Sequence, residues 1–254
     1  MTTVASKLPN LVKTPIKQLR DVVKAIPYYG TGRYCPICGK SSRRFRPYGR
    51  PAREDAQCPR CGSLERHRLL WLYLTKKTDF FDGKPKKMLH VAPELIFESK
   101  FKRRLGDRYL TADLYNPRAM VKMDITNIDC PDQSFDVIYC SHVLEHVQDD
   151  RKAMSEFYRV LKNTGWAILL VPITVEKTLE DPSIVDPEER LKVFGQEDHV
   201  RKYGLDYVDR LREAGFHVEL NKANDLVQNN QAVEMGITHA SGEIYYCTKQ
   251  SLGG

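Results

Sequence analysis

The middle of the chain carries two apolar runs of strand length with a helical pattern between them. Residues 135–140 are mostly branched and aromatic, as in a buried strand. Val143, Leu144 and Val147 follow at helical spacing. Further side chains three, four and seven positions apart continue this stripe and predict one face of a helix: Met154, Phe157, Val160 and Leu161. We expect Gly165 to end this helix as a left-handed cap, and residues 166–173 to form a strand buried on both faces. The pattern therefore predicts a right-handed parallel strand–helix–strand unit.

Residues of a different character stand where the predicted strands end. Asp124, Ser141, His142 and Pro172 all lie near such ends. In open parallel sheets, ligands bind beyond the carboxyl ends of the strands. The pattern therefore predicts a binding site at this edge of the sheet.

The C-terminal part continues the alternation of helix and strand. Residues 205–214 have an amphipathic helical pattern that stops at Gly215, and residues 216–220 read as a strand. Residues 243–249 read as a further strand. We expect this last strand to complete the sheet in the antiparallel direction.

Three segments of the chain carry a family resemblance. They are D-I-T (124–126), F-D-V-I-Y-C-S-H-V-L-E-H-V (135–147) and R-V-L-K-N-T-G-W-A-I-L-L-V-P-I (159–173). Together they resemble the second half of a class I S-adenosylmethionine-dependent methyltransferase, and the order of elements extends the resemblance over residues 88–254. The resemblance implies a Rossmann-like α/β fold, a doubly wound and mostly parallel sheet with an antiparallel C-terminal strand. We expect it to occupy residues 78–254, with an acceptor-side insertion at about residues 174–204.

The turn after the first strand departs from the family's pattern. Here the family carries an acidic residue and a glycine-rich loop, whereas this chain has His90 in place of the acid. Ala92, Pro93 and Glu94 stand where glycine would let the backbone approach the cofactor. Glu94 is our candidate for binding the amino group of the cofactor.

The resemblance implies two further cofactor contacts. Asp113 ends the predicted strand 109–113 and would accept hydrogen bonds from both ribose hydroxyls. Asp124 would receive the adenine amino group, with Ile125 packing on the ring; the alternative for each aspartate is an ordinary turn residue. The predicted cofactor-binding residues are His90, Val91, Ala92, Pro93, Glu94, Asp113, Leu114, Asp124, Ile125, Ser141 and His142.

A polar segment near residue 200 is our candidate acceptor site. The residues that we expect to bind the acceptor are Gln196, Asp198, His199 and Arg201. His142 and His199 are the candidate general bases. The alternative is a helix start in which Gln196 to Asp198 are caps and His199 is exposed.

The N-terminal part has the signature of a metal site. Cys35, Cys38, Cys58 and Cys61 form the pattern C-x2-C-x19-C-x2-C, which predicts a small structural zinc ribbon at residues 31–77. A glycine follows each pair and relieves a tight turn. Iron in a rubredoxin-like arrangement is the alternative. We expect the neighbouring His67 at the surface or facing a substrate.

The charge is unevenly distributed. Residues 1–77 hold 17 Lys and Arg against 4 Asp and Glu, whereas the rest holds 23 against 29. Arginines alternate with Phe45 and Tyr48 between the cysteine pairs, which favours RNA binding or, alternatively, a solvated hairpin. Residues 1–30 include a basic amphipathic helix that would either contact a membrane surface or nucleic acid, or dock on the catalytic domain.

Composition indicates the cellular compartment of the protein. Seven cysteines, four of them in C-x-x-C pairs, fit a reducing compartment better than a disulfide framework. The sequence shows no secretory signal and no apolar run of membrane-spanning length, so we expect a cytoplasmic protein.

Three functions agree with these patterns. The first is methyl transfer from S-adenosylmethionine to a small hydroxylated or glycan-type acceptor, with O-methylation favoured. The second is methylation of rRNA or tRNA, with the basic zinc ribbon binding RNA. The third is a scaffold that binds S-adenosylmethionine without turnover.

Overall fold

The computed structural model describes residues 26–49 and 51–249, and it divides the chain into two compact units. One unit comprises Met1–Leu72 and Val227–Ser241, and the other comprises Tyr73–Leu226 and Gly242–Gly254. The basic amphipathic helix that we expect within residues 1–30 falls mostly on residues 1–25, which lie outside the described residues. Sequence reasoning assigned residues 227–241 to the catalytic domain, whereas they cluster with the cysteine-containing unit.

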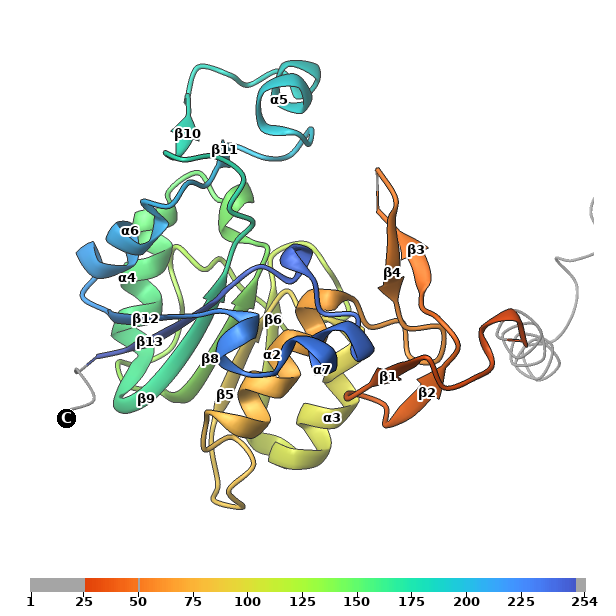
Figure 1. The fold of residues 1–254 in the computed structure, drawn as a ribbon. Coiled ribbons are helices and arrows are strands. Elements are labelled where there is room, and N and C mark those ends of the chain that lie inside the picture. The colour runs from red at the N-terminus through yellow and green to blue at the C-terminus, as the bar shows by residue number, and fades with distance from the viewer. Residues whose placement is uncertain (1–25, 50, 250–254) are drawn as a thin grey trace, which may run out of the picture. The chain divides into compact units, whose positions relative to one another are not determined.

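A seven-stranded sheet forms the core of the second unit (Figure 1). Its strand order is β12-β13-β9-β8-β5-β6-β7. The five parallel strands are β5 (Met88–Val91), β6 (Tyr109–Asp113), β7 (Val121–Lys122), β8 (Phe135–Ser141) and β9 (Leu161–Leu170). The last strand, β13 (Ile244–Thr248), runs antiparallel to both β9 and β12 (His217–Asn221). The predicted α/β fold with an antiparallel C-terminal strand is confirmed.

Amphipathic helices cover the sheet because each buries one apolar stripe. α3 (Leu95–Leu105) buries Phe97, Phe101 and Leu105, and it is followed by the 3-10 turn η3 (Gly106–Arg108). α4 (Asp150–Val160) buries Met154, Phe157 and Val160. α4 and α6 (Tyr207–Glu213) lie beside one another, away from α3 (Figure 1).

The predicted end of the central helix is wrong. α4 ends at Val160, and β9 already begins at Leu161 and includes residues 163–165. Gly165 is not a left-handed cap. A Cβ atom added to it would lie 2.7 Å from the carbonyl oxygen of Asp136 in the neighbouring strand. The glycine is therefore required by a close approach of two strands, near a register shift of the β8–β9 ladder.

The segment after β9 forms a small structure of its own. β10 (Leu179–Glu180) pairs antiparallel with β11 (Arg201–Lys202), and α5 (Pro187–Phe194) lies between them. Figure 1 shows this segment beyond the carboxyl ends of the strands. α5 begins at its cap Asp186 and ends at the left-handed Gly195. The alternative in which Gln196 to Asp198 start a helix is therefore wrong.

The unit that contains the cysteines is built from two short hairpins. β1 (Arg33–Cys35) pairs with β2 (Lys40–Ser42), and β3 (Arg46–Tyr48) pairs with β4 (Arg53–Gln57). Its remaining short elements are η2 (Ile26–Tyr28), α7 (Asn229–Glu234), η6 (His239–Ser241) and the first part of α2 (Glu65–Lys76). η5 (Ala223–Asp225) belongs to the other unit.

A buried arginine holds this small unit together. Arg68 donates to the carbonyls of Ser63, Ala56 and Gly236 at 2.8, 3.0 and 2.8 Å. Its guanidinium also lies 4.5 Å from the ring centroid of Phe45. These contacts tie residues 227–241 to the hairpins within the same unit.

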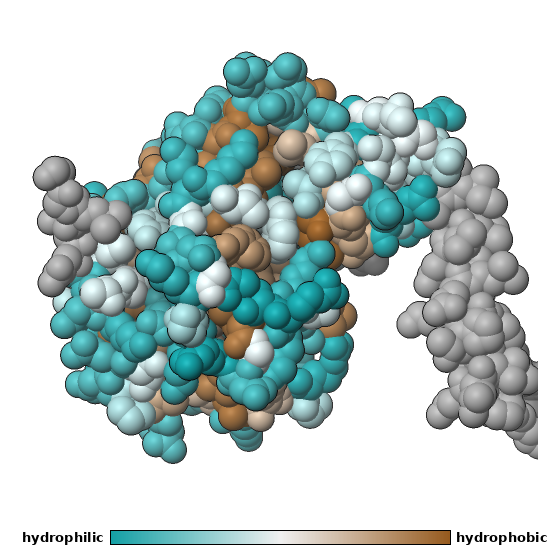
Figure 2. Space-filling model, turned by 90° about the horizontal axis from the view of Figure 1, so that it is seen from below, coloured by the Kyte–Doolittle hydropathy of each residue, from teal (hydrophilic) through white to brown (hydrophobic). Residues whose placement is uncertain are grey.

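Hydrophilic residues cover most of the face shown in Figure 2, and hydrophobic residues appear between them in separate small groups. Within the described ranges, no helix is both long enough and apolar enough to cross a bilayer.

Candidate functional site

Four cysteines converge at the tips of the two turns in the first unit. The sulfur atoms of Cys35, Cys38, Cys58 and Cys61 all lie within 4.8 Å of one another. The Cys35–Cys61 and Cys38–Cys58 distances are 3.6 and 3.9 Å. Zinc–sulfur bonds of about 2.3 Å in a tetrahedron separate the sulfurs by roughly 3.8 Å, so the geometry fits zinc.

The two turns that carry these cysteines have the same construction. Gly39 donates its backbone N–H to the carbonyl of Cys35, and Gly62 donates to the carbonyl of Cys58, both at 2.9 Å. Both glycines have positive φ, +65° and +78°, which explains why glycine follows each pair. The Ser63 hydroxyl lies 3.2 and 3.3 Å from the sulfurs of Cys35 and Cys61.

His67 is buried, and the expectation that it faces solvent or a substrate is wrong. Its Nδ1 atom accepts the backbone N–H of Leu64 at 3.0 Å. This contact satisfies a donor just before the start of α2.

The arginine-rich hairpin offers fewer free side chains for binding RNA than its sequence indicates. Phe45 is buried, and Arg53 is paired with Glu65 at 3.0 Å. Arg44 and Arg46 lie over the ring of Tyr28. Of the predicted stacking aromatics, only Tyr48 is exposed in the part of the hairpin that the structure describes.

At the carboxyl end of β6, Asp113 uses only one of its two carboxylate oxygens to accept hydrogen bonds from the backbone. Its Oδ1 atom accepts the backbone N–H groups of Tyr115 and Asn116, each at 2.8 Å. Among the described residues, Oδ2 accepts no hydrogen bond. Leu114 beside it is half-buried.

The turn after β5 is strained where the family's glycine would stand. Ala92 has φ of +48°, and its N–H donates to the carbonyl of Ala112 at 2.8 Å. A non-glycine residue pays roughly 1–2 kcal/mol for this conformation. The neighbouring Val91 and Pro93 are buried.

Glu94 and His90 contact neighbouring strands. Glu94 accepts the hydroxyl of Tyr139 in β8 at 2.6 Å. His90 is fully buried among aromatic rings, with Nδ1 2.8 Å from the Tyr109 hydroxyl. Burial lowers the pKa of His90 to about 4, so its ring is neutral at pH 7. Its cofactor role stays a prediction.

Asp124 forms a local turn. Its Oδ1 atom accepts the backbone N–H and the hydroxyl of Thr126, both at 2.8 Å, and the side chain is exposed. Ile125 is buried. These contacts fit the ordinary turn role and leave the predicted adenine contact untested.

The end of β8 brings a group of imidazoles and a carboxylate together. Ser141 is buried, and its hydroxyl has no hydrogen-bond partner among the described residues. His142 has φ of +55°, and its Nδ1 atom lies 3.3 Å from Oε1 of Glu145. Glu145 and His146 belong to the 3-10 turn η4 (Leu144–His146). We name Glu145, His146 and His199 the His–Glu cluster, because their ligand atoms all lie within 4.8 Å of one another.

His199 joins this cluster from the segment after α5. Its ring centroid lies 4.7 Å from that of His146, and the backbone N–H of Val200 donates to the carbonyl of Glu145 at 2.9 Å. Burial, and next the neighbouring His146, lower the pKa of His199. Asp198 is exposed and lies 3.1 Å from Nδ1 of His146, whereas Gln196 is exposed in the connecting turn.

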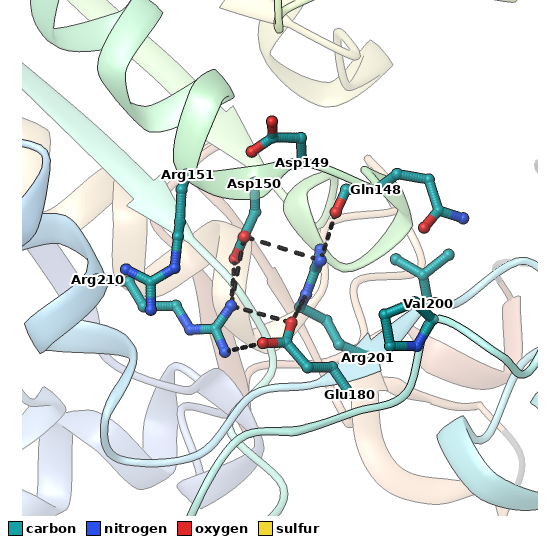
Figure 3. A pocket seen from close by; sticks show the side chains of 9 residues that line it. Gln148, Asp149, Asp150, Arg151, Glu180, Val200, Arg201 and Arg210 are labelled. Atoms are coloured by element: carbon teal, nitrogen blue, oxygen red, sulfur yellow. Dashed lines mark hydrogen bonds and ion pairs between the residues drawn. The ribbon is translucent and has the colours of Figure 1, made fainter.

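Arg201 is buried in an ion-pair network that Figure 3 shows at close range. The carboxylates of Asp150 and Glu180 face the guanidinium groups of Arg201 and Arg210 beside an open pocket. The hydrogen bond from Arg210, and also that from Arg201, hold the pKa of Glu180 down at about 2.

The remaining donors of Arg201 reach the backbone that follows β8. They bond to the carbonyls of Leu144 at 2.9 Å, Gln148 at 2.8 Å and Val147. Since its guanidinium is occupied in this way, Arg201 holds the turn that carries Glu145 and His146.

Sequence reasoning missed Glu145. Its signal was present as H-x-x-E-H, which puts three polar groups into an otherwise apolar segment. The buried position of Glu145 becomes evident only when the turn is folded against residues 199–201.

Comparison with known proteins concerns the region of the sheet. Residues 91–169 match the family model described as a methyltransferase domain. The uncharacterized methyltransferase YcgJ of Bacillus subtilis (strain 168) is 30% identical over 115 residues. The match covers 44% of this chain and 44% of that protein, which is less than half of each.

Solved structures are similar over a longer part of the chain. A S-adenosylmethionine dependent methyltransferase from Mesorhizobium loti is 12% identical, with 70% of this chain and 97% of that chain covered and a TM-score of 0.48. For YcgJ from Bacillus subtilis the identity is 16%, the coverage is 71% and 94%, and the TM-score is 0.44. The observed strand order and the family match together identify the fold of the second unit as the Rossmann-like fold of class I methyltransferases.

Proposed function

We propose that the protein is a methyltransferase that uses S-adenosylmethionine and acts on a hydroxyl group of a small or glycan-type acceptor. The observation that carries the proposal is the open Oδ2 atom of Asp113 at the carboxyl end of β6, within a sheet of methyltransferase topology. Ligands of such sheets bind at this edge.

The residues present at this edge fit the cofactor. Asp113 offers a carboxylate oxygen to the ribose hydroxyls, and its other oxygen is fixed by two backbone N–H groups. Ala92 takes the left-handed conformation that glycine would supply, so the turn can approach a ligand without glycine. The buried Ser141 hydroxyl is a further unused polar group at the end of β8.

The chain's own residues would prepare the acceptor. When bound, S-adenosylmethionine supplies a methyl group on a positively charged sulfur, which keeps the bonding electron pair as the methyl carbon bonds to the acceptor oxygen. His142, the candidate base at the end of β8, would take the proton that the hydroxyl loses. Arg201 would hold η4 in place through its hydrogen bonds to the carbonyls of Leu144 and Gln148. Asp198 and Gln196, exposed on the adjacent turn, remain our proposed acceptor contacts.

We further propose that the four cysteines hold a structural zinc ion. The sulfur distances fit a tetrahedron, and four thiolates leave no coordination position for a substrate. The ion would close a unit whose hairpins are otherwise too short to fold alone.

The test is calorimetric titration of S-adenosylmethionine and its demethylated product into the zinc-loaded protein. We expect micromolar binding that Asp113→Ala weakens at least tenfold, because the variant loses a charge-assisted hydrogen bond. Asp129→Asn, at an exposed position, is the matched control. If the unmodified protein bound neither compound, the proposal would be wrong.

The scaffold alternative is tested in the same material. A radiolabelled methyl group transferred to any hydroxylated acceptor would exclude it. The RNA alternative predicts binding that weakens steeply with salt and with replacement of the exposed Arg43 and Arg44. Salt-insensitive behaviour would favour the small acceptor.

A further inference from the structure

We infer that Glu145, His146 and His199 form a binding site for a divalent transition-metal ion at the carboxyl end of β8, distinct from the four-cysteine site. Two imidazoles and one carboxylate bring their ligand atoms within 4.8 Å of one another. All three belong to the second unit, whereas the cysteines belong to the first.

Two buried atoms of this cluster carry the inference. Oε2 of Glu145 and Nε2 of His199 have no hydrogen-bond partner among the described residues. The two residues are only 2% and 6% exposed. A buried carboxylate oxygen or imidazole nitrogen without a partner costs roughly 1–3 kcal/mol, and more for a charged group. A cation bound to both atoms would satisfy them together.

The contacts around the cluster fix its ligands from outside. His142 lies 3.3 Å from the other oxygen of Glu145, and Asp198 lies 3.1 Å from Nδ1 of His146. Carboxylates and imidazoles that contact a metal ligand in this way hold its orientation. The hydrogen bond from Val200 to the Glu145 carbonyl and the grip of Arg201 on η4 keep the two chain segments together.

The ligand set indicates the class of ion. Metal–ligand bonds of about 2.1 Å put the ligand atoms about 3 to 3.5 Å apart, so small rotations of the half-exposed His146 would close the site. Two imidazoles and one carboxylate suit Mn²⁺, Fe²⁺, Co²⁺ or Zn²⁺ and leave other coordination positions open. Four thiolates, by contrast, prefer zinc and form a closed site.

An open position here would bind oxygen atoms of the acceptor. This role rests on the proposed methyl transfer, in which the acceptor hydroxyl lies at the edge of the sheet beside the candidate base His142. A bound cation lowers the pKa of a hydroxyl that it coordinates, which aids loss of the proton. Acceptors with two adjacent oxygens would then be preferred, since both can coordinate one ion.

The test uses Mn²⁺ as the probe and the full chain carrying a single equivalent of zinc, enough for the four cysteines alone, without methyl donor or acceptor. We expect electron paramagnetic resonance titration to show one saturable Mn²⁺ per chain, and Glu145→Gln or His199→Gln to weaken binding at least tenfold. His146→Gln is half-exposed and provides a variant that folds if the buried ones do not. His217→Gln, exposed in β12, should bind as the unmodified protein does.

Zinc content and circular dichroism of each variant show that the protein is folded. No saturable Mn²⁺ binding, or unchanged binding in folded His146→Gln, would overturn the inference. Because the titration contains no methyl donor, its result is independent of the calorimetric test of the proposed function.

Discussion

The four-cysteine site and the carboxyl edge of the sheet both bring several ligand-type side chains together, but they differ in backbone conformation and in how many of these side chains have partners. In the first, glycines occupy the positive-φ positions of both turns, and the sulfurs lie at distances that one zinc ion would satisfy. At the sheet edge, Ala92 and His142 occupy positive-φ positions without being glycine. Ser141, Glu145 and His199 there keep buried atoms without hydrogen-bond partners among the described residues.

The difference separates a site built for stability from a site built for ligands. Relaxed turns, and four sulfurs that a single zinc ion would satisfy, lower the free energy of the folded unit. Strain and unused hydrogen-bonding groups raise the free energy of the folded state, and they persist where a ligand uses them. The sheet edge therefore carries the marks of a functional site, and the cysteines carry those of a structural one.

The largest effect is expected for Cys58→Ser. It removes one thiolate, and structural zinc contributes on the order of 10 kcal/mol of binding free energy. We expect loss of stoichiometric zinc and rapid proteolysis within residues 26–72, measured by elemental analysis and mass spectrometry. Cys130→Ser, outside the cluster, is the control. Retention of zinc by Cys58→Ser would show that the four cysteines do not form a closed structural zinc site.

The second-largest effect is expected for Arg201→Met. This variant tests whether the insertion at about residues 174–204 holds the edge of the sheet in place. Arg201→Met leaves the buried carboxylate of Asp150 and the partly exposed one of Glu180 without one of their partners, and it releases η4. Breaking a buried ion pair costs about 3–5 kcal/mol. Urea unfolding should show this loss, whereas Arg151→Met, half-exposed at the rim, should cost less than about 1 kcal/mol. Equal losses in both variants would contradict the assigned role of Arg201.

A third prediction concerns pH and the buried His90. Its pKa is about 4 in the folded protein against 6.5 for an ordinary histidine, so the unfolded chain binds the proton more readily. The stabilisation by neutral His90 is complete above pH 6.5 and is lost as pH falls toward 4, by about 3 kcal/mol. His90→Phe should therefore show a shallower decrease in unfolding free energy between pH 7 and pH 4.

The comparison for that measurement is His217→Gln, which removes an exposed histidine. It should keep the steep pH dependence of the unmodified protein. Parallel stability curves for His90→Phe and the unmodified protein would mean that His90 titrates normally.

The smallest effect is expected for Ala92→Gly, which tests whether the backbone at the sheet edge is strained. Ala92→Gly relieves a positive φ, so we expect the free energy of unfolding to rise by up to about 1 kcal/mol. Ala112→Gly, in an extended strand, should instead lower it by about the same amount. A decrease for Ala92→Gly, measured in the same urea titration, would mean that the turn is unstrained.

Much of the fold followed from local patterns. Strand 109–113 has the bounds that its sequence predicts, and residues 135–140 differ from β8 by one residue. The end of α4 was missed because the glycine signal was interpreted as local. Gly165 is required instead by the approach of Asp136 from another strand. The candidate site was half foreseen: His142 and His199 were named from sequence, whereas Glu145 was not.

By itself, the sequence determined the order of strands and helices, the cysteine pattern and the edge at which polar residues gather, because apolar periodicity and ligand spacing act within a few residues. Only the tertiary structure decided that His199 meets Glu145, that Arg201 holds η4, and that residues 227–241 join the cysteine unit. These contacts join residues far apart in the chain. Their distances depend on how complete elements pack, and no local pattern encodes that packing.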